Sequence, residues 1–149
     1  MELRFVSPKC PDYAVLAKKL DDYYFSLVGD VHLRYSEANR PENMACRVIA
    51  YDGNRPIGCG CWKAVDEETA EVKRIYVEPE FRRRGVASTI IELLESHIMA
   101  SGYTKALLET ARTTNDSKSL YLSLGYKEIP YYGSPAGAEN CRCFLKELF

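Results

Sequence analysis

The 149-residue sequence lacks both a long apolar run and an excess of charge. No uninterrupted apolar stretch approaches the roughly 20 residues that span a bilayer, so no membrane partner is expected. The chain has 20 Lys and Arg against 21 Asp and Glu, a net charge of −1. Because a surface that follows nucleic-acid phosphates needs a basic excess, this balance argues against a nucleic-acid partner. The first residues, 1–5, show no signal-peptide pattern, and we expect a soluble cytoplasmic protein.

Histidine and tryptophan are scarce, with two histidines and one tryptophan, and the six cysteines do not have the spacing of common zinc sites. Cys59-x-Cys61 and Cys141-x-Cys143 are expected on strands, where alternate residues share one face of a sheet. Zinc ribbons instead use two-residue spacers in turns. We therefore expect reduced, buried thiols and no metal site.

The chain shows no linker, no internal repeat and no low-complexity tract. A length of 149 residues with 46% hydrophobic residues suits a single domain over residues 1–149. Hydrophobic periodicity predicts strands over 3–6, 47–51, 56–64, 69–77, 103–110, 126–132 and 141–148, and helices over 11–28, 31–39, 86–100 and 117–124. This order predicts an α/β fold with a mixed sheet and helices on both of its faces.

Residues 71–88 are the most informative stretch, because a strand leads through a basic, glycine-containing loop into a helix. The strand is expected to stop at Pro79, since proline has no N–H for a β-ladder. Residues 82–85, Arg-Arg-Arg-Gly, then precede the helix directly. The unpaired N–H groups and the positive dipole end of a helix N-terminus attract anions, and arginines add bidentate contacts. The loop therefore predicts a site for a small anionic ligand, although it fits neither the P-loop nor the dinucleotide fingerprint.

Arg82, Gly85 and Ala87 match the Arg/Gln-x-x-Gly-x-Gly/Ala signature of the GNAT superfamily of acetyl-CoA-dependent N-acetyltransferases. Three further segments resemble that family in the expected order, namely 56–60, 108–110 and 120–126. The resemblance covers nearly the whole chain. It implies the GNAT fold, in which a mixed, mostly antiparallel central sheet has helices on both faces and its fourth and fifth strands splay apart.

The same resemblance implies acetyl-CoA as co-substrate and places it in the gap between these two strands. Pantetheine is expected on the backbone of Ile75, Tyr76 and Val77. The diphosphate is expected on the loop and the first helical turn, which comprise Arg82, Arg83, Arg84, Gly85, Val86, Ala87 and Ser88. Asn115 is expected to contact the cofactor from the last helix, although it stands one residue closer to Tyr121 than in many members.

Tyr121 matches the family tyrosine that acts as general acid and gives a proton to the departing thiolate. The alternative is a core tyrosine that packs the helix on the sheet. Glu71 and Glu109 are equal candidates for the general base, because some members place a carboxylate on the fourth strand and others on the fifth. Either would need a pKa raised by desolvation. Each could instead be a salt-bridged strand-end carboxylate, with bulk water taking the proton.

The resemblance implies an enzyme that moves the acetyl group of acetyl-CoA directly to a primary amine of a small-molecule or amino-acid-like acceptor. Two alternatives stay open at this point: acetylation of protein or peptide N-termini, and a regulatory acyl-CoA-binding module without catalysis. The acceptor is expected beside the tyrosines at 23–24, 35 and 131–132, which could hold an ammonium group or form a homodimer surface. The resemblance cannot choose the acceptor, because the acceptor meets the variable segments of the fold.

Overall fold

The computed structural model describes residues 1–29, 39–111, 115–131 and 141–149. The helix expected over 31–39 lies almost wholly outside these ranges, as do Tyr35 and Tyr132. The side chain of Asn115 is also outside the description, although its backbone begins a helix, so its expected cofactor contact stays a prediction.

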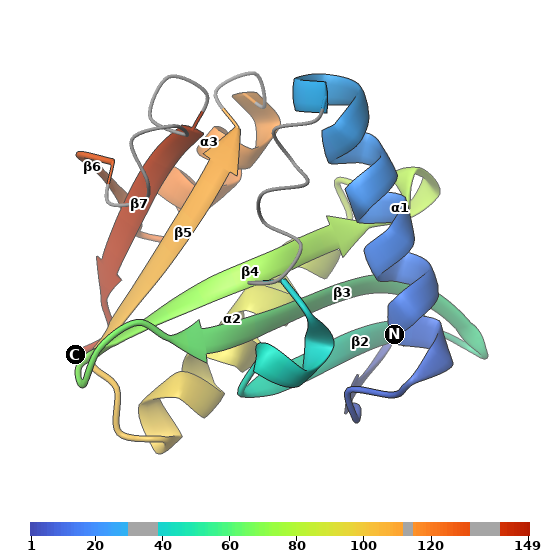
Figure 1. Ribbon diagram of the computed structural model, residues 1–149, viewed down its shortest axis with the longest axis horizontal. Helices are drawn as coiled ribbons and strands as arrows, with labels where there is room; N and C mark the ends of the chain where they lie inside the picture. The colour runs from blue at the N-terminus through green and yellow to red at the C-terminus, as the bar shows by residue number, and fades with distance from the viewer. Residues whose placement is uncertain (30–38, 112–114, 132–140) are drawn as a thin grey trace.

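Seven described strands form one central sheet with the order β1-β2-β3-β4-β5-β7-β6 (Figure 1). They are β1 (Glu2–Phe5), β2 (Cys46–Asp52), β3 (Arg55–Ala64), β4 (Thr69–Val77), β5 (Lys105–Ala111), β6 (Lys127–Ile129) and β7 (Cys141–Glu147). β4 and β5 pair in parallel, and every other pair of neighbours is antiparallel. The predicted mixed, mostly antiparallel sheet is confirmed.

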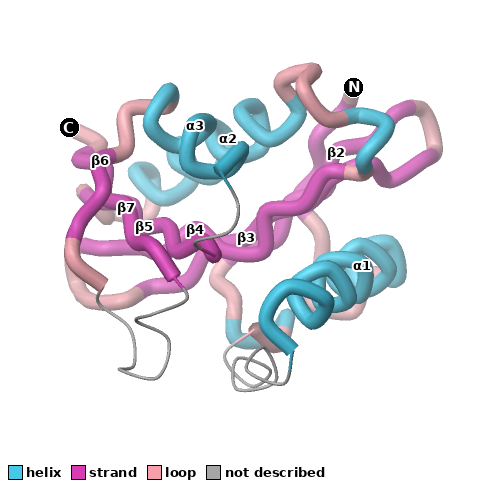
Figure 2. Tube along the Cα trace, turned by 90° about the horizontal axis from the view of Figure 1, so that it is seen from above, coloured by secondary structure: helices cyan, strands magenta, loops and turns pink. Residues whose placement is uncertain are grey.

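Helices cover both faces of the sheet, as predicted (Figure 2). α1 (Pro11–Val28) lies on one face, and α2 (Val86–Ala100) and α3 (Asn115–Ser123) lie on the other. Two short 3₁₀ turns, η2 (Pro41–Asn43) and η3 (Pro79–Phe81), stand in the connections before β2 and after β4. The described elements therefore form a three-layer α/β arrangement.

Proline and glycine decide where several elements begin and end. Pro11 stands in the first turn of α1, where its missing N–H is not needed, and Gly29 ends that helix with a φ of 62°. The predicted bounds of α2 and β4 match the structure. The strand expected over 126–132 is wrong in length, because β6 ends at Ile129. Pro130 follows and has no N–H with which to continue the ladder.

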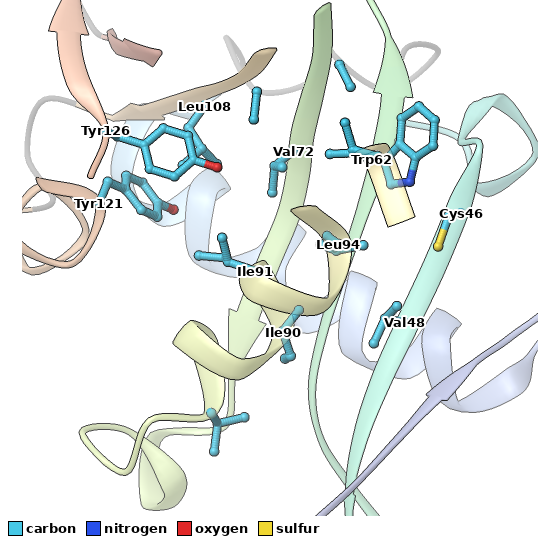
Figure 3. Packing of buried hydrophobic residues seen from close by; sticks show 14 of the residues in the cluster. Cys46, Val48, Trp62, Val72, Ile90, Ile91, Leu94, Leu108, Tyr121 and Tyr126 are labelled. Carbon is cyan, nitrogen blue, oxygen red and sulfur yellow. The ribbon is translucent and has the colours of Figure 1, made fainter. Parts of the chain in front are cut away.

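Two hydrophobic clusters fill the spaces on either side of the sheet. On the α2 side, Ile90, Ile91 and Leu94 are fully buried against the strands (Figure 3). On the α1 side, Tyr13 and Leu16 are fully buried against the opposite face. Burying one large apolar side chain stabilises a fold by about 1.5–3 kcal/mol. The helices are therefore held mainly by their apolar faces.

Trp62 belongs to the cluster on the α2 side. Its Nε1 donates a hydrogen bond to Nδ1 of His97 at 3.0 Å. The His97 ring also lies near Phe5 of β1, with 5.3 Å between ring centres. Trp62 and His97 thus have structural partners, and these contacts explain both residues without a role in catalysis.

A side chain at Gly60 of β3 would collide with the layer formed by α2. A Cβ atom at this position would stand 2.6 Å from Cδ1 of Ile75 and 2.8 Å from Cγ2 of Ile90. We expect Gly60→Ala to lower the free energy of unfolding by about 1–3 kcal/mol, the range for overpacked cores. Urea denaturation would measure the loss.

The double variant Gly60→Ala/Ile75→Val is the matched control, because Ile75→Val removes the Cδ1 atom that the new methyl group meets. In a double-mutant cycle, the cost of Gly60→Ala should be smaller in the Ile75→Val background than in the wild type. Equal stability of the wild type and Gly60→Ala would contradict the close packing at this position.

Candidate functional site

β4 and β5 separate beyond the first half of β4. They pair only between Thr69–Val72 and Lys105–Leu108. β4 then stays with β3 up to Val77, while β5 continues along β7 to Ala111. The two strands diverge and leave a gap in the sheet, as the family resemblance implied (Figure 1).

A β-bulge at Arg74 turns β4 away from β5. Two steps along β3, from Cys59 to Cys61, correspond to three steps along β4, and Arg74 has a φ of 62°. A bulge of this kind bends its strand and increases the local twist. The side chain of Arg74 is only 5% exposed and lies 2.9 Å from Oδ1 of Asp21. Its Nη2 also donates to the carbonyl of Ala17 at 3.0 Å, so the bulge is tied to α1.

Buried thiols hold the carbonyl groups of the bulge. Cys61 donates to the carbonyl of Lys73 at 3.4 Å, and Cys59 donates to that of Arg74 at 3.4 Å. The hydroxyl of Tyr13 on α1 donates to Sγ of Cys61 at 3.5 Å. Cys59 and Cys61 thus share one face of the sheet, as their spacing predicted. All six thiols are reduced, and the described residues contain no group of three or more His, Cys, Asp or Glu able to hold a metal ion.

A cleft of about 740 Å³ opens along the side of β4 that faces the gap. Its wall consists of Leu20, Tyr23 and Tyr24 of α1, Ile75, Tyr76 and Val77 of β4, Phe81, Arg82, Arg83, Gly85, Val86, Ala87 and Ser88 before and in α2, and Ser117, Ser119, Leu120 and Tyr121 of α3. The cleft brings together most of the residues predicted for cofactor binding and adds Tyr121 to them. Arg84 is outside this wall, and its guanidinium lies over the ring of Phe81, 5.3 Å from the ring centre.

The loop before α2 and the first turn of that helix form part of the wall of the cleft. Gly85 has a φ of 80° and Arg83 a φ of 63°, so two left-handed residues turn the chain. No side chain of the described residues caps the N-terminus of α2. The first N–H groups of a helix have no acceptor within it. Arg82 is fixed beside them because its Nε donates to the carbonyl of Val77 at 2.9 Å, so this part of the cleft suits an anion.

Glu78, between β4 and η3, makes contacts beside the cleft that the sequence pattern did not predict. Its carboxylate is buried, 2.6 Å from Nζ of Lys19 and 3.8 Å from Nη2 of Arg55. Lys19 belongs to α1, so the ion pair fastens that helix to the end of β4, just before the basic loop. A buried carboxylate needs such partners, and they also reduce its repulsion of a phosphate group. In the sequence Glu78 is only one acidic residue before a basic loop, which is too weak a signal to identify the ion pair.

Tyr121 reaches the cleft from α3. Its buried ring lies beside that of Tyr126 (Figure 3), with 6.3 Å between ring centres, and 5.8 Å from the ring centre of Phe144. Burial raises the pKa of the Tyr121 hydroxyl and nearby Tyr24 adds to the rise, while a hydrogen bond with Ser117 opposes it. The hydroxyl is therefore protonated at neutral pH. Tyr121 packs in the core and lines the cleft at the same time.

A buried carboxylate supports this tyrosine pair from α2. The hydroxyl of Tyr126 donates to Oε2 of Glu95 at 2.8 Å, and Nζ of Lys146 donates to Oε1 at 3.0 Å. The network holds Tyr126 against Tyr121. No motif in the sequence pointed to it, because its members lie far apart along the chain.

The two candidate bases lie on the α1 face of the sheet. Val72 and Leu108 belong to the cluster on the α2 side, so strand alternation turns Glu71 and Glu109 toward α1. Glu71 is buried within the paired part of the strands, opposite Leu107. Glu109 is half-buried and directly follows Leu108, the last residue of β5 that pairs with β4. The wall of the cleft includes neither glutamate, and Glu109 is the one at the gap.

Residues 13–126 match the Acetyltransferase (GNAT) family. Because the match covers more than half of the chain, the protein belongs to that family. An uncharacterised N-acetyltransferase of Dictyostelium discoideum is 34% identical over 77 residues, which are 51% of this chain and 35% of that protein. The match thus spans well under half the length of this relative.

Solved structures share the fold over nearly the whole chain. An acetyltransferase from Streptococcus agalactiae has a TM-score of 0.79 at 18% identity, covering 98% of this chain and 97% of that one. The PaiA N-acetyltransferase of Thermoplasma acidophilum, solved in complex with coenzyme A, has a TM-score of 0.74 at 18% identity, covering 98% of each chain. At these identities the likeness concerns the fold alone. None of the described helices has the length and apolar character needed to cross a bilayer.

The buried thiol of Cys61 predicts a loss of stability in alkali. Burial raises the pKa of Cys61 to about 11, although the hydrogen bond from Tyr13 opposes the rise. In the unfolded chain the thiol loses its proton above about pH 8.5, while the folded protein retains it, so rising pH favours unfolding. Between pH 8.5 and 10 this one group should lower the free energy of unfolding by about 1.5 kcal/mol.

Urea denaturation of the wild type and Cys61→Ala at both pH values, with a reductant present, would isolate this contribution. The variant should lose less stability than the wild type between the two pH values, whatever its stability at pH 8.5. The same pH dependence in both proteins would contradict the assignment to Cys61.

Proposed function

We propose that the chain is an N-acetyltransferase that moves an acetyl group from acetyl-CoA to a primary amine. The observation that carries this proposal is the cleft along β4 beyond its last pair with β5, whose wall includes the basic loop before α2 and Tyr121. Membership of the GNAT family and the coenzyme A complex of the Thermoplasma protein support the choice of reaction and co-substrate. We propose further that residues 1–149 act as one catalytic domain.

The residues at the basic end of the cleft fit a diphosphate. The space in which Gly85 would carry a Cβ is open, with no atom within 4 Å, so a ligand can approach the backbone. Arg82 and Arg83 in the wall supply positive charge, and the amides of residues 86–88 can donate to phosphate oxygens. Farther along, the backbone of residues 75–77 lies in the wall where β5 has already turned away, and it can bond the amides of a pantetheine arm.

Transfer to an amine needs an unprotonated nucleophile and a proton for the leaving sulfur. Bound acetyl-CoA supplies the activated acyl group as a thioester. Tyr121, whose hydroxyl stays protonated at neutral pH, donates its proton to the departing sulfur. Glu109, at the opening of the gap, accepts a proton from the ammonium form of the acceptor directly or through water. Glu71 is the less accessible candidate because it is buried in the paired part of the strands.

Direct transfer of the acetyl group from acetyl-CoA to the amine agrees with the protonated state of the buried thiols. Cys59 and Cys61 donate their hydrogens to backbone carbonyls, and burial raises the pKa of both thiols. A protonated, hydrogen-bonded thiol is a poor nucleophile. The proposal therefore includes no acetylated enzyme.

We propose a small or amino-acid-like amine as the acceptor. Tyr23 and Tyr24 line the cleft from α1, on the face of the sheet toward which Glu109 points. Aromatic faces attract an ammonium group by cation–π interaction, and a carboxylate attracts it by charge. A regulatory module without catalysis would not need a protonated tyrosine hydroxyl in the cleft.

Acetyl-CoA should stabilise the protein against heat. At one hundred times its dissociation constant, a ligand that binds only the folded state adds about 2.7 kcal/mol of stability. Gly85→Asp should abolish the thermal shift, because it places a side chain and a negative charge where the phosphates are expected. Differential scanning fluorimetry with millimolar acetyl-CoA would measure the shift.

Gly53→Asp is the matched control for this substitution. Gly53 has a φ of 59° in the hairpin turn between β2 and β3, and no atom lies within 4 Å of its Cβ position. This variant should keep the full thermal shift. The absence of any shift in the wild type would argue against acetyl-CoA as the co-substrate.

Tyr121→Phe should reduce turnover far more than binding of acetyl-CoA. The substitution removes only the hydroxyl, so the contacts of the ring with Phe144 and Tyr126 remain. A proton donor typically contributes about a hundredfold or more to the rate, so kcat and kcat/KM should fall together by at least that factor. Thiol release from acetyl-CoA in a screen of polyamines, amino acids, aminoglycosides and peptides would identify an acceptor and provide the assay.

Tyr103→Phe removes a hydroxyl from a tyrosine that packs against Trp62, outside the wall of the cleft, and should keep the wild-type rate. Wild-type turnover by Tyr121→Phe would show that the tyrosine is structural. The proposed cofactor site would then stand without the proposed general acid.

A further inference from the structure

We propose that Tyr24 of α1 closes the acyl end of the cleft and limits the transferred group to acetyl. The inference rests on the proposed function, because it assumes an acyl-CoA in the cleft. It goes beyond that function by naming the residue that selects the size of the acyl group.

Tyr24 stands in the wall of the cleft on α1, and Tyr121 of α3 belongs to the same wall. Its half-buried ring packs on the α1-side cluster, which contains Leu20 one turn earlier in the helix. The ring of Tyr23 meets it edge-on, with 5.7 Å between ring centres. The ring of Tyr24 is therefore held by neighbours within α1 and by the core beneath it.

Groups from several elements surround the hydroxyl of Tyr24. Burial raises the pKa of Tyr24 to about 12. The rise in this pKa is increased by Tyr23, Cys141 and Glu109 and is opposed by Arg74. Tyr24 in turn contributes to the raised pKa of Tyr121. Apart from Tyr23, these neighbours belong to β4, β5, β7 and α3. Because α1 and α3 lie on opposite faces of the sheet and both line the cleft, Tyr24 and Tyr121 reach it from opposite sides.

The position of Tyr24 relative to β4 is fixed by two ionic contacts of α1. Arg74 holds the helix at Ala17 and Asp21, and Glu78 holds it at Lys19. These anchors lie within two turns before Tyr24. A wall that is tied down in this way cannot move back to admit a longer group without breaking an ion pair in which one partner is buried.

The direction of the cleft then places the acyl group against Tyr24. With the diphosphate at residues 82–88, the reactive end of the cosubstrate lies toward Tyr121, beyond residues 75–77 of β4. An acyl group bonded to a sulfur beside the Tyr121 hydroxyl has the ring of Tyr24 on its far side. In this arrangement we expect each methylene beyond the two carbons of an acetyl group to meet the ring of Tyr24.

Calorimetric titration of the protein with coenzyme A, acetyl-CoA, propionyl-CoA and butyryl-CoA tests the inference without knowledge of the acceptor. The wild type should bind butyryl-CoA at least tenfold more weakly than acetyl-CoA. Tyr24→Ala should raise the affinity for butyryl-CoA relative to acetyl-CoA, because a buried methylene contributes about fourfold to affinity, or about fifteenfold for two. Tyr24→Leu should change the ratio of butyryl-CoA to acetyl-CoA affinity in the same direction. It keeps an apolar side chain on the core, so it serves as the test if the alanine variant does not fold.

Two control variants test whether the aromatic ring of Tyr24, and not another change on α1, sets the ratio of acyl-CoA affinities. Tyr24→Phe keeps the ring and should keep the wild-type ratio of affinities. Phe25→Ala removes an aromatic ring from an adjacent, 49% exposed position on α1 outside the wall of the cleft, and it should also keep the ratio.

The inference is overturned if Tyr24→Ala and Tyr24→Leu bind coenzyme A as the wild type does and show an unchanged ratio of butyryl-CoA to acetyl-CoA affinity. It is also overturned if the wild type binds both acyl-CoAs equally well. Failure of the proposed function looks different, because the wild type would then bind neither coenzyme A nor its acyl derivatives.

Discussion

The separation of β4 from β5 at Arg74 is the constraint on which the rest of the site depends. A strand that loses its neighbour inside a sheet leaves backbone groups that need other partners. Here the carbonyls of Lys73 and Arg74 accept hydrogen bonds from buried cysteine thiols. The next residues of β4, 75–77, instead face the cleft. The bulge therefore produces both the gap and the strand edge that a ligand can bond.

The position of α1, which forms the wall of the cleft opposite this edge of β4, depends on ion pairs as well as on apolar packing. Hydrophobic burial holds α1 on the sheet, but it is not directional and does not by itself set the position of a helix along its axis. The contacts from Arg74 to Asp21 and from Glu78 to Lys19 supply that position. They hold the α1 helix so that its tyrosines line the same cleft as Tyr121. Two buried charged residues with no catalytic step of their own thus shape the cleft.

The strand and the helix on either side of the basic loop have the predicted bounds, whereas the contacts that packing makes around the cleft were not predicted. The loop over residues 82–88 needs only a strand end, a left-handed glycine and a helix start, all visible in the sequence. Glu71 and Glu109 looked equivalent because each is a carboxylate on a strand and both turn toward the same face. Only the register of β4 and β5 shows that Glu109 stands at the gap while Glu71 lies within the paired segment.

The sequence by itself determined the order of strands and helices, the α/β class, the basic glycine-containing loop before α2 and the shared face of Cys59 and Cys61. Each of these depends on residues within one strand or one turn, where periodicity, proline and glycine act directly. Tertiary structure alone decided the pairing of Arg74 with Asp21, of Glu78 with Lys19 and of Tyr126 with Glu95. Many charged and polar residues could make such pairs, and only the packing of the layers brings particular partners into contact.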